Sequence, residues 1–175
     1  VRDFIEEHGL TPVMLLCTHQ HFDHVWGAAF VLRQWPHIKA YGNRIDFEKL
    51  PLPSEQLKGY GIPLPLEDVP MERYTLVQQD DLIRLGSEEL RVLFVPGHAP
   101  GHIAFYAGES DILPSGDTLL QGTIGRTDFW YGDYDQLVEA IKSQYMTLPD
   151  ETIVFSGHGP ETTIGFERRK NPFLQ

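Results

Sequence analysis

Four side chains that can bind a metal ion lie within six consecutive residues near the start of the chain. They belong to the sequence THQHFDH at residues 18–24, which follows an apolar run at residues 13–17. The run predicts a buried strand. In an extended segment alternate side chains point to one side, so three ligands would face the same direction: His19, His21 and Asp23. His24 would turn toward a neighbouring direction, so one short loop could serve two metal ions. The fold must therefore provide a rigid strand end that further ligands can approach.

Three more candidate ligands follow apolar runs farther along the chain, and each has a glycine beside it. They are His98 after residues 90–95, Asp117 after residues 111–114, and His158 after residues 152–155. Glycine lets the backbone turn sharply and approach a site closely. A single Gly-His or Gly-Asp dipeptide would be an ordinary turn. Three such positions, added to the first cluster, predict a site that strand ends bring together. Its imidazole and carboxylate donors suit zinc, iron or manganese.

With these motifs the chain resembles the metallo-β-lactamase superfamily, and most closely its short, single-domain glyoxalase II-type (hydroxyacylglutathione hydrolase-like) hydrolases. The matching residues are THQHFDH at 18–24, PGHAPGH at 96–102, GD at 116–117, GRTDF at 125–129, GHGP at 157–160 and NPFL at 171–174. The resemblance implies an α/β (α+β) fold, the αββα sandwich of two mixed sheets with outer helices. It would form one domain over residues 1–175. Members of the family have several strands before the helix predicted at residues 1–9, so we expect that N-terminal strands are missing and the domain is truncated there.

The resemblance gives each candidate ligand a role. The first metal ion would be held by His19, His21 and His98. The second would be held by Asp23, His24 and His158. Asp117 would bridge the two. The implied cofactors are two divalent metal ions, with zinc as the first choice and iron or manganese as alternatives.

Such a centre supports a hydrolytic reaction. Two divalent cations that share a water lower its pKa toward neutrality, and the metal-bound hydroxide can attack a polarised carbonyl. Asp23 could orient this water or accept its proton, as a catalytic residue. A thiolate leaving group would suit the second metal. We therefore expect a binuclear metal-dependent hydrolase, a glyoxalase II-like thioesterase, which cleaves a thioester such as S-lactoylglutathione. Classical members grip glutathione with a further C-terminal helical domain, and only residues 161–175 follow the last GHGP motif here, so the thiol carrier stays open.

Rival functions exist within the same superfamily. A persulfide dioxygenase with a single iron would use His19, His98 and Asp117 or a similar set, and it also has a GRTDF loop. The complete second set of ligands favours the binuclear hydrolase over this alternative. A β-lactamase is compatible with the fold, but the GRTDF and NPFL sequences favour the glyoxalase II type. A nucleic-acid-binding or partner-binding member is disfavoured by the net charge of −11.

Several other residues have two interpretations. Arg126 could pair with a substrate carboxylate, or with Asp128 to fix its own loop, and the second is favoured. The segment at residues 49–72, rich in proline and leucine, could form a lid whose Tyr60 contacts substrate, or a surface excursion, which is favoured. His102 is expected to support the ligands rather than to bind metal, because seven ligand positions are already filled.

Length and composition limit the domain count, the membrane association and the disulfide content of the protein. A length of 175 residues suits one domain, and no run of 18 apolar residues predicts a membrane span. The single cysteine, Cys17, lies in an apolar run, where a core position is expected, and it excludes an internal disulfide. We expect a cytoplasmic protein that acts on a small-molecule thioester, with no nucleic-acid or membrane partner and an oligomeric state that the sequence leaves open.

Outside the motifs, hydrophobic periodicity predicts alternating strands and helices. We expect helices at residues 1–9, 25–34 and 135–145, and strands at 38–41, 82–85, 89–95 and 102–107. The last helix would be capped by Asp133 or Asp135.

Overall fold

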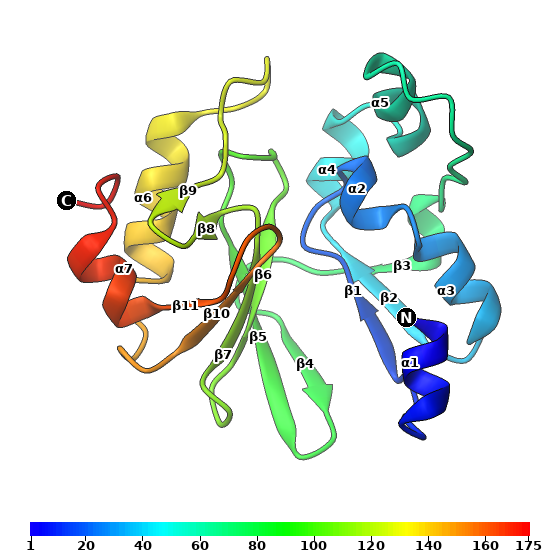
Figure 1. The fold of residues 1–175 in the computed structure, drawn as a ribbon, viewed down its shortest axis with the longest axis horizontal. Helices are drawn as coiled ribbons and strands as arrows, with labels where there is room; N and C mark the ends of the chain where they lie inside the picture. Colours follow the sequence, from blue (N-terminus) through cyan, green and yellow to red (C-terminus); the bar gives the residue numbers. More distant parts are fainter.

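The computed structural model describes residues 1–175 and arranges them in four layers (Figure 1). A six-stranded sheet, in the order β11-β10-β7-β6-β5-β4, lies beside a three-stranded sheet in the order β1-β2-β3. Helices α6 and α7 cover the outer face of the larger sheet, and helices α2 and α3 lie outside the smaller one (Figure 1). The expected αββα sandwich is confirmed. The smaller sheet is parallel throughout, whereas the larger one is mixed.

The strands are short. The smaller sheet contains β1 (Met14–Leu16), β2 (Lys39–Gly42) and β3 (Tyr74–Leu76). The larger sheet contains β4 (Leu82–Leu85), β5 (Glu88–Phe94), β6 (Ile103–Ala107), β7 (Ile112–Gly116), β10 (Ile153–Ser156) and β11 (Thr162–Thr163). A separate hairpin pairs β8 (Leu119–Leu120) with β9 (Thr123–Ile124).

The helices are α1 (Arg2–Glu7), α2 (Phe22–Val25), α3 (Ala28–Gln34), α4 (Arg44–Lys49), α5 (Pro53–Gly59), α6 (Tyr134–Gln144) and α7 (Ile164–Lys170), with one 3-10 turn at Met71–Arg73. None of them combines the length and the apolar character needed to cross a membrane.

Helix α6 shows how the local sequence produces packing. Its N-cap is Asp133, one of the two caps expected, whose side chain accepts a hydrogen bond from Gln136 N. Leu137 and Ile141 are one turn apart and therefore share a face, and both are fully buried against the larger sheet. Cys17 is buried, as expected, in a separate hydrophobic cluster that includes Ala28 and Leu32 of α3.

The direction of the strands brings the candidate ligands to one edge. Strands β7 and β10 are parallel, and β5 runs the same way because both β5 and β7 are antiparallel to β6. Their carboxyl ends therefore lie together, and each is followed by a candidate ligand: His98, Asp117 and His158. The loop after β1 reaches the same edge from the smaller sheet (Figure 1).

Two sequence expectations need correction. The strand at residues 13–17 forms, but β1 is half-buried and Val13 is 56% exposed, because β1 is the edge strand of its sheet. The helix expected at residues 25–34 is divided into α2 and α3, and α2 begins earlier, at Phe22. Asp23 therefore lies on a helix and does not continue the extended alternation of His19 and His21.

Candidate metal centre

The structure brings all seven candidate ligands together. Six of them form two groups of three, and Asp117 forms a third, overlapping group with His19 and His24. The first group is His19, His21 and His98, and the second is Asp23, His24 and His158. Within each group the ligand atoms lie within 4.8 Å of one another. The early start of α2 explains why Asp23 joins His24 rather than the extended histidines. The first two groups contain the same residues as those that the family resemblance implies, and their role as metal ligands stays a prediction.

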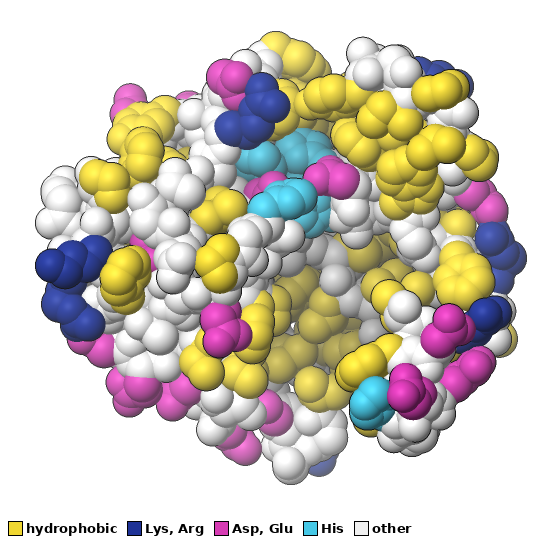
Figure 2. Space-filling model, in the orientation of Figure 1, with side chains coloured by type: hydrophobic (Ala, Val, Ile, Leu, Met, Phe, Trp, Pro, Cys, Tyr) yellow, Lys and Arg dark blue, Asp and Glu magenta, His cyan; other side chains and the backbone are white.

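Asp117 lies between the two groups. Its Oδ1 is 3.3 Å from His24 Nε2, and its Oδ2 is 3.5 Å from His158 Nε2 and 3.7 Å from His98 Nε2. Burial opposes ionisation of this carboxyl, but the hydrogen bond and charge of His24 hold its pKa below the usual value. An ionised carboxylate in contact with both groups has the position that a bridging ligand needs. Figure 2 shows histidines and acidic side chains gathered in a hollow of the surface.

The first group fits a metal ion. His19 Nε2 is buried and has no hydrogen-bond partner, although a buried polar atom is costly to leave unpaired. Burial, followed by the charges of neighbouring histidines, holds the pKa of His19 well below its usual value. The same causes, with burial first and His98 next, lower the pKa of His21 to about 3. These imidazoles are therefore neutral at physiological pH, which is the form that binds metal.

Hydrogen bonds from outside the two groups orient the rings. His98 Nδ1–H donates to the Arg126 carbonyl at 2.8 Å, and His21 Nε2 shares a hydrogen bond of 2.8 Å with the Tyr131 hydroxyl. The remaining ring nitrogens, His98 Nε2 and His21 Nδ1, face each other at 3.0 Å. A partner on one nitrogen fixes which nitrogen faces the metal. The contact of Tyr131 with His21 was not predicted, because the residues lie 110 positions apart and no local pattern links them.

His102 lies behind the centre and outside both groups. It is fully buried, its Nε2 accepts a hydrogen bond of 3.2 Å from Asp117 N–H, and its ring stacks on His19 with 4.6 Å between centroids. These contacts agree with the expected supporting role.

We expect His102→Ala to leave the metal content near that of the unchanged protein while lowering the free energy of unfolding. The cavity and the unpaired Asp117 N–H should together cost about 2–4 kcal/mol. Metal analysis of the folded variant, with denaturant unfolding of both proteins, checks this. Loss of one metal ion per chain would instead make His102 a ligand.

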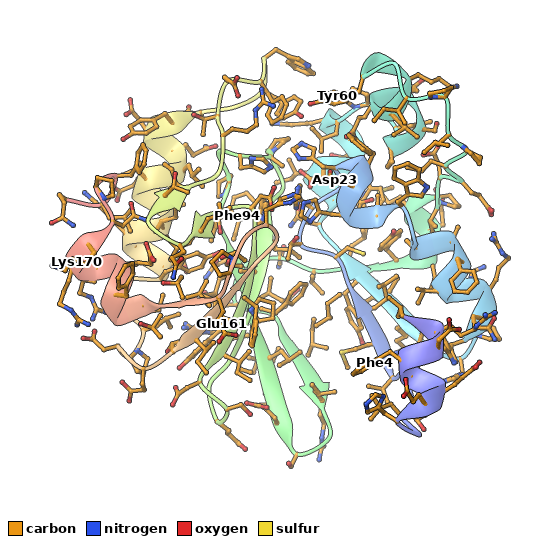
Figure 3. The ribbon with its side chains drawn as sticks, in the orientation of Figure 1. Phe4, Asp23, Tyr60, Phe94, Glu161 and Lys170 are labelled. Atoms are coloured by element: carbon orange, nitrogen blue, oxygen red, sulfur yellow. The ribbon has the colours of Figure 1, made fainter.

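A cleft of about 440 Å³ opens onto the centre. It is lined by ligands from both groups and by Phe22, Tyr60, Arg126 and Trp130. Figure 3 places Asp23 on α2 and Tyr60 at the end of α5. Trp130 is 80% exposed and Tyr60 57% exposed, so both stand at the rim rather than in the core.

Arg126 pairs within its own loop. Its Nε and one terminal nitrogen donate to the two carboxylate oxygens of Asp128 at 2.6 and 2.8 Å. Its guanidinium also lies over the Phe129 ring, 4.5 Å from the centroid. The pair with Asp128 that the favoured interpretation of Arg126 requires is present, and the side chain also lines the cleft, so a contact with substrate stays a prediction.

The segment at residues 49–72 forms a wall of the site. Gln56, on α5, donates from Nε2 to the Gln20 carbonyl at 2.9 Å and accepts from Phe22 N–H at 3.2 Å. These bonds attach the segment to the loop at residues 18–24. The favoured interpretation, a surface excursion, therefore understates its contacts with the centre.

The two groups should lose metal at different pH values. Burial alone would lower the pKa of His24, but its hydrogen bond to Asp117, with the charges of Asp117 and Asp23, raises it above the usual value. The pKa values of His19, His21 and His98 are lowered instead. On acidification His24 is therefore protonated first, and a protonated imidazole cannot bind metal.

We accordingly expect metal at Asp23, His24 and His158 to be released at a higher pH than metal at the three-histidine group. Metal content after dialysis at steps between about pH 8 and pH 4 should fall in two stages. A single-stage loss of both ions would contradict the expected order.

Comparison with known proteins gives consistent matches. Residues 3–158 match the sequence profile of the metallo-beta-lactamase superfamily. The chain is similar to the probable metallo-hydrolase YqgX of Bacillus subtilis, with 39% identity over 99% of this chain and 81% of that protein. It is also similar to the hydroxyacylglutathione hydrolase GloC of Haemophilus influenzae, with 41% identity over 97% of this chain and 79% of that protein.

Solved structures agree with these matches. The crystal structure of the B3 metallo-beta-lactamase BLEG-1 has a TM-score of 0.88 and 34% identity, over 99% of this chain and 82% of that one. The di-iron-bound form of TTHA1623 has a TM-score of 0.86 and 35% identity, over 99% and 83%.

Proposed function

The chain belongs to the metallo-beta-lactamase superfamily, and from this premise we propose that it is a binuclear hydrolase that cleaves thioesters, with S-lactoylglutathione as the first substrate to test. The observation that carries the proposal is the pair of ligand groups that Asp117 contacts on both sides, at the wall of an open cleft. The similarity to a hydroxyacylglutathione hydrolase supports the choice of substrate.

The chain's own residues would divide the work as follows. The two groups would hold two divalent metal ions, and Asp117 would bridge them. When bound, such ions lower the pKa of a water and polarise a carbonyl group. Asp23 is the ligand most open to the cleft among the acidic ones, with 40% of its side chain exposed and its Oδ2 3.2 Å from His158 Nε2. We assign it the role of orienting the attacking water and holding its proton.

Substrate contacts would come from the rim of the cleft. The bonds to Asp128 occupy Nε and one terminal nitrogen of Arg126, so the other terminal nitrogen can donate to a carboxylate on the thiol carrier. Tyr60, on the opposite wall, would pack against the same carrier. A cleft of about 440 Å³ suits a small molecule rather than a polymer.

The remaining assignments follow from the donor set and the charge. Imidazole and carboxylate donors make zinc the first metal to test, and the similarity to a di-iron-bound structure makes iron the second. The net charge of −11 favours a small-molecule substrate over nucleic acid. Because low-molecular-weight thiols that carry acyl groups are found in the cytoplasm, we place the protein there.

Two measurements on the purified chain test the proposal. Elemental analysis should give two metal ions per chain. Hydrolysis, followed for both substrates as release of the acid, should be fast with S-lactoylglutathione and slow with the matching oxygen ester. The Asp23→Asn variant should keep the metal of the three-histidine group, bind the second metal ion more weakly and lose most of its turnover.

Three results would overturn the proposal. Hydrolysis of a β-lactam in place of thioesters would make the chain a lactamase. A single iron, with oxygen uptake on a persulfide, would make it an oxygenase. Equal rates on the two esters would remove the preference for a thiolate leaving group.

A further inference from the structure

A buried carboxylate connects the two loops that carry the three-histidine group. Asp46, on α4, is 1% exposed. Its Oδ2 accepts a hydrogen bond of 3.0 Å from Gln20 N–H, and its Oδ1 accepts one of 2.5 Å from Gly101 N–H. Gln20 lies between His19 and His21, and Gly101 lies three residues after His98. One side chain therefore holds both loops by their backbones.

We propose that Asp46 is a positioning residue, which sets the distance between the loop of His19 and His21 and the loop of His98 and thereby tunes the metal affinity of that group. The proposal rests on the proposed function only in requiring that the group binds metal; it does not depend on the substrate.

Hydrogen bonds fix the N-terminal turn of α4, which carries Asp46. The N-cap of α4 is Asn43, whose Oδ1 accepts from Ile45 N–H at 2.9 Å and whose Nδ2 donates to the Val77 carbonyl at 2.9 Å. The second bond attaches the start of α4 to the chain just after β3. Asp46 therefore presents its carboxylate from a fixed helix turn, and the loops are held against an element that does not belong to either of them.

The approach of the second loop to α4 is close enough to require glycine. A Cβ at Gly101 would lie 2.5 Å from Asp46 N and 2.8 Å from Asp46 Oδ1. These distances are shorter than the contacts that Cβ atoms make in proteins. Only a residue without a side chain therefore lets the His98 loop reach the carboxylate.

A carboxylate is also the group that fits the two donors. It offers an acceptor oxygen to each backbone N–H, whereas an asparagine of the same shape offers one oxygen and one NH2 group. The NH2 group would face one of the two backbone N–H groups. One of the two hydrogen bonds would then be replaced by a repulsion between two donors. Burying a carboxylate with no cationic side chain as partner is costly. Cations bound nearby would favour its charged form, and its charge would in turn favour their binding.

A matched control separates positioning from general stability. Glu167, on α7, is a second fully buried carboxylate, with Gly122 N–H, Thr162 Oγ1 and Asn171 Nδ2 as its donors at 2.6 to 3.1 Å. None of these donors belongs to the two ligand groups or to the two loops that Asp46 connects. Replacing it removes a buried carboxylate without touching the metal centre.

The test compares Asp46→Asn with Glu167→Gln in the full chain. Each protein is stripped of metal, and zinc is titrated in competition with a chromogenic chelator, while Tm is measured on the metal-free forms. We expect Asp46→Asn to weaken zinc binding about 10- to 100-fold. Glu167→Gln should lower Tm and leave zinc affinity within about twofold of the unchanged protein.

Two results would overturn the positioning role: unchanged zinc affinity in Asp46→Asn, or equal weakening in Glu167→Gln. If Asp46→Asn does not fold, Gly101→Ala decides, because its methyl group pushes the same two partners apart. Weakened affinity in that variant supports the role, and unchanged affinity removes it. Because no substrate is used, absence of thioesterase activity leaves this test intact, whereas absence of zinc binding in the unchanged protein would remove both proposals.

Discussion

Asp117→Ala is expected to abolish hydrolysis and to lower the metal content of the chain. Asp117 contacts His24, His98 and His158, so its loss removes the carboxylate that the two ligand groups share. The histidines would also lose the negative charge that offsets two cations. Because metal activation of a water and a carbonyl is worth several kcal/mol, we expect at least about a 10³-fold fall in kcat/KM.

Elemental analysis and thioester hydrolysis measure the two effects on the same preparation. Asp135→Ala is a suitable control, because Asp135 is an exposed aspartate in the first turn of α6 and contacts no ligand. The control should keep its metal and its activity. Two metal ions per chain in the Asp117 variant would show that the carboxylate does not bridge them.

Gly157→Ala is expected to damage the centre without removing any ligand. A Cβ at this position would overlap Asp117 Oδ1 and lie 2.6 Å from His24 Cε1. Both side chains would have to move, and a displacement of about 1 Å in a catalytic group costs about 10²-fold in rate. The expected result is a fall of that size in kcat/KM, together with a lower affinity for the second metal ion.

The control for this substitution is Gly27→Ala. Gly27 has an ordinary φ of −84°, and a Cβ there would meet nothing within 4 Å. It should therefore keep wild-type kinetics, and its Tm should stay the same or rise slightly. If Gly157→Ala also kept full activity and metal, the close packing of Gly157 against Asp117 would have no functional consequence.

Much of the fold followed from short-range pattern. The apolar runs at residues 90–95, 111–114 and 152–155 became β5, β7 and β10, because short apolar runs bounded by turn residues favour strands. Asp133 capped α6 because an N-cap is a contact between neighbours in the sequence. The edge position of β1 could not be predicted in this way, since the number of neighbours of a strand is a property of the sheet.

Some features of the candidate site also followed from local sequence, and others depended on tertiary packing. The sequence by itself determined which side chains meet, because each candidate ligand directly follows a strand and strand direction carries it to one edge. Their roles as ligands stay a prediction. Only the tertiary structure decided how they are held: α2 begins at Phe22 and carries Asp23 beside His24, and Asp46 joins two loops across 26 and 55 residues. Contacts between backbone N–H groups and distant carboxylates leave no local pattern, because their partners become neighbours only when the sheets pack.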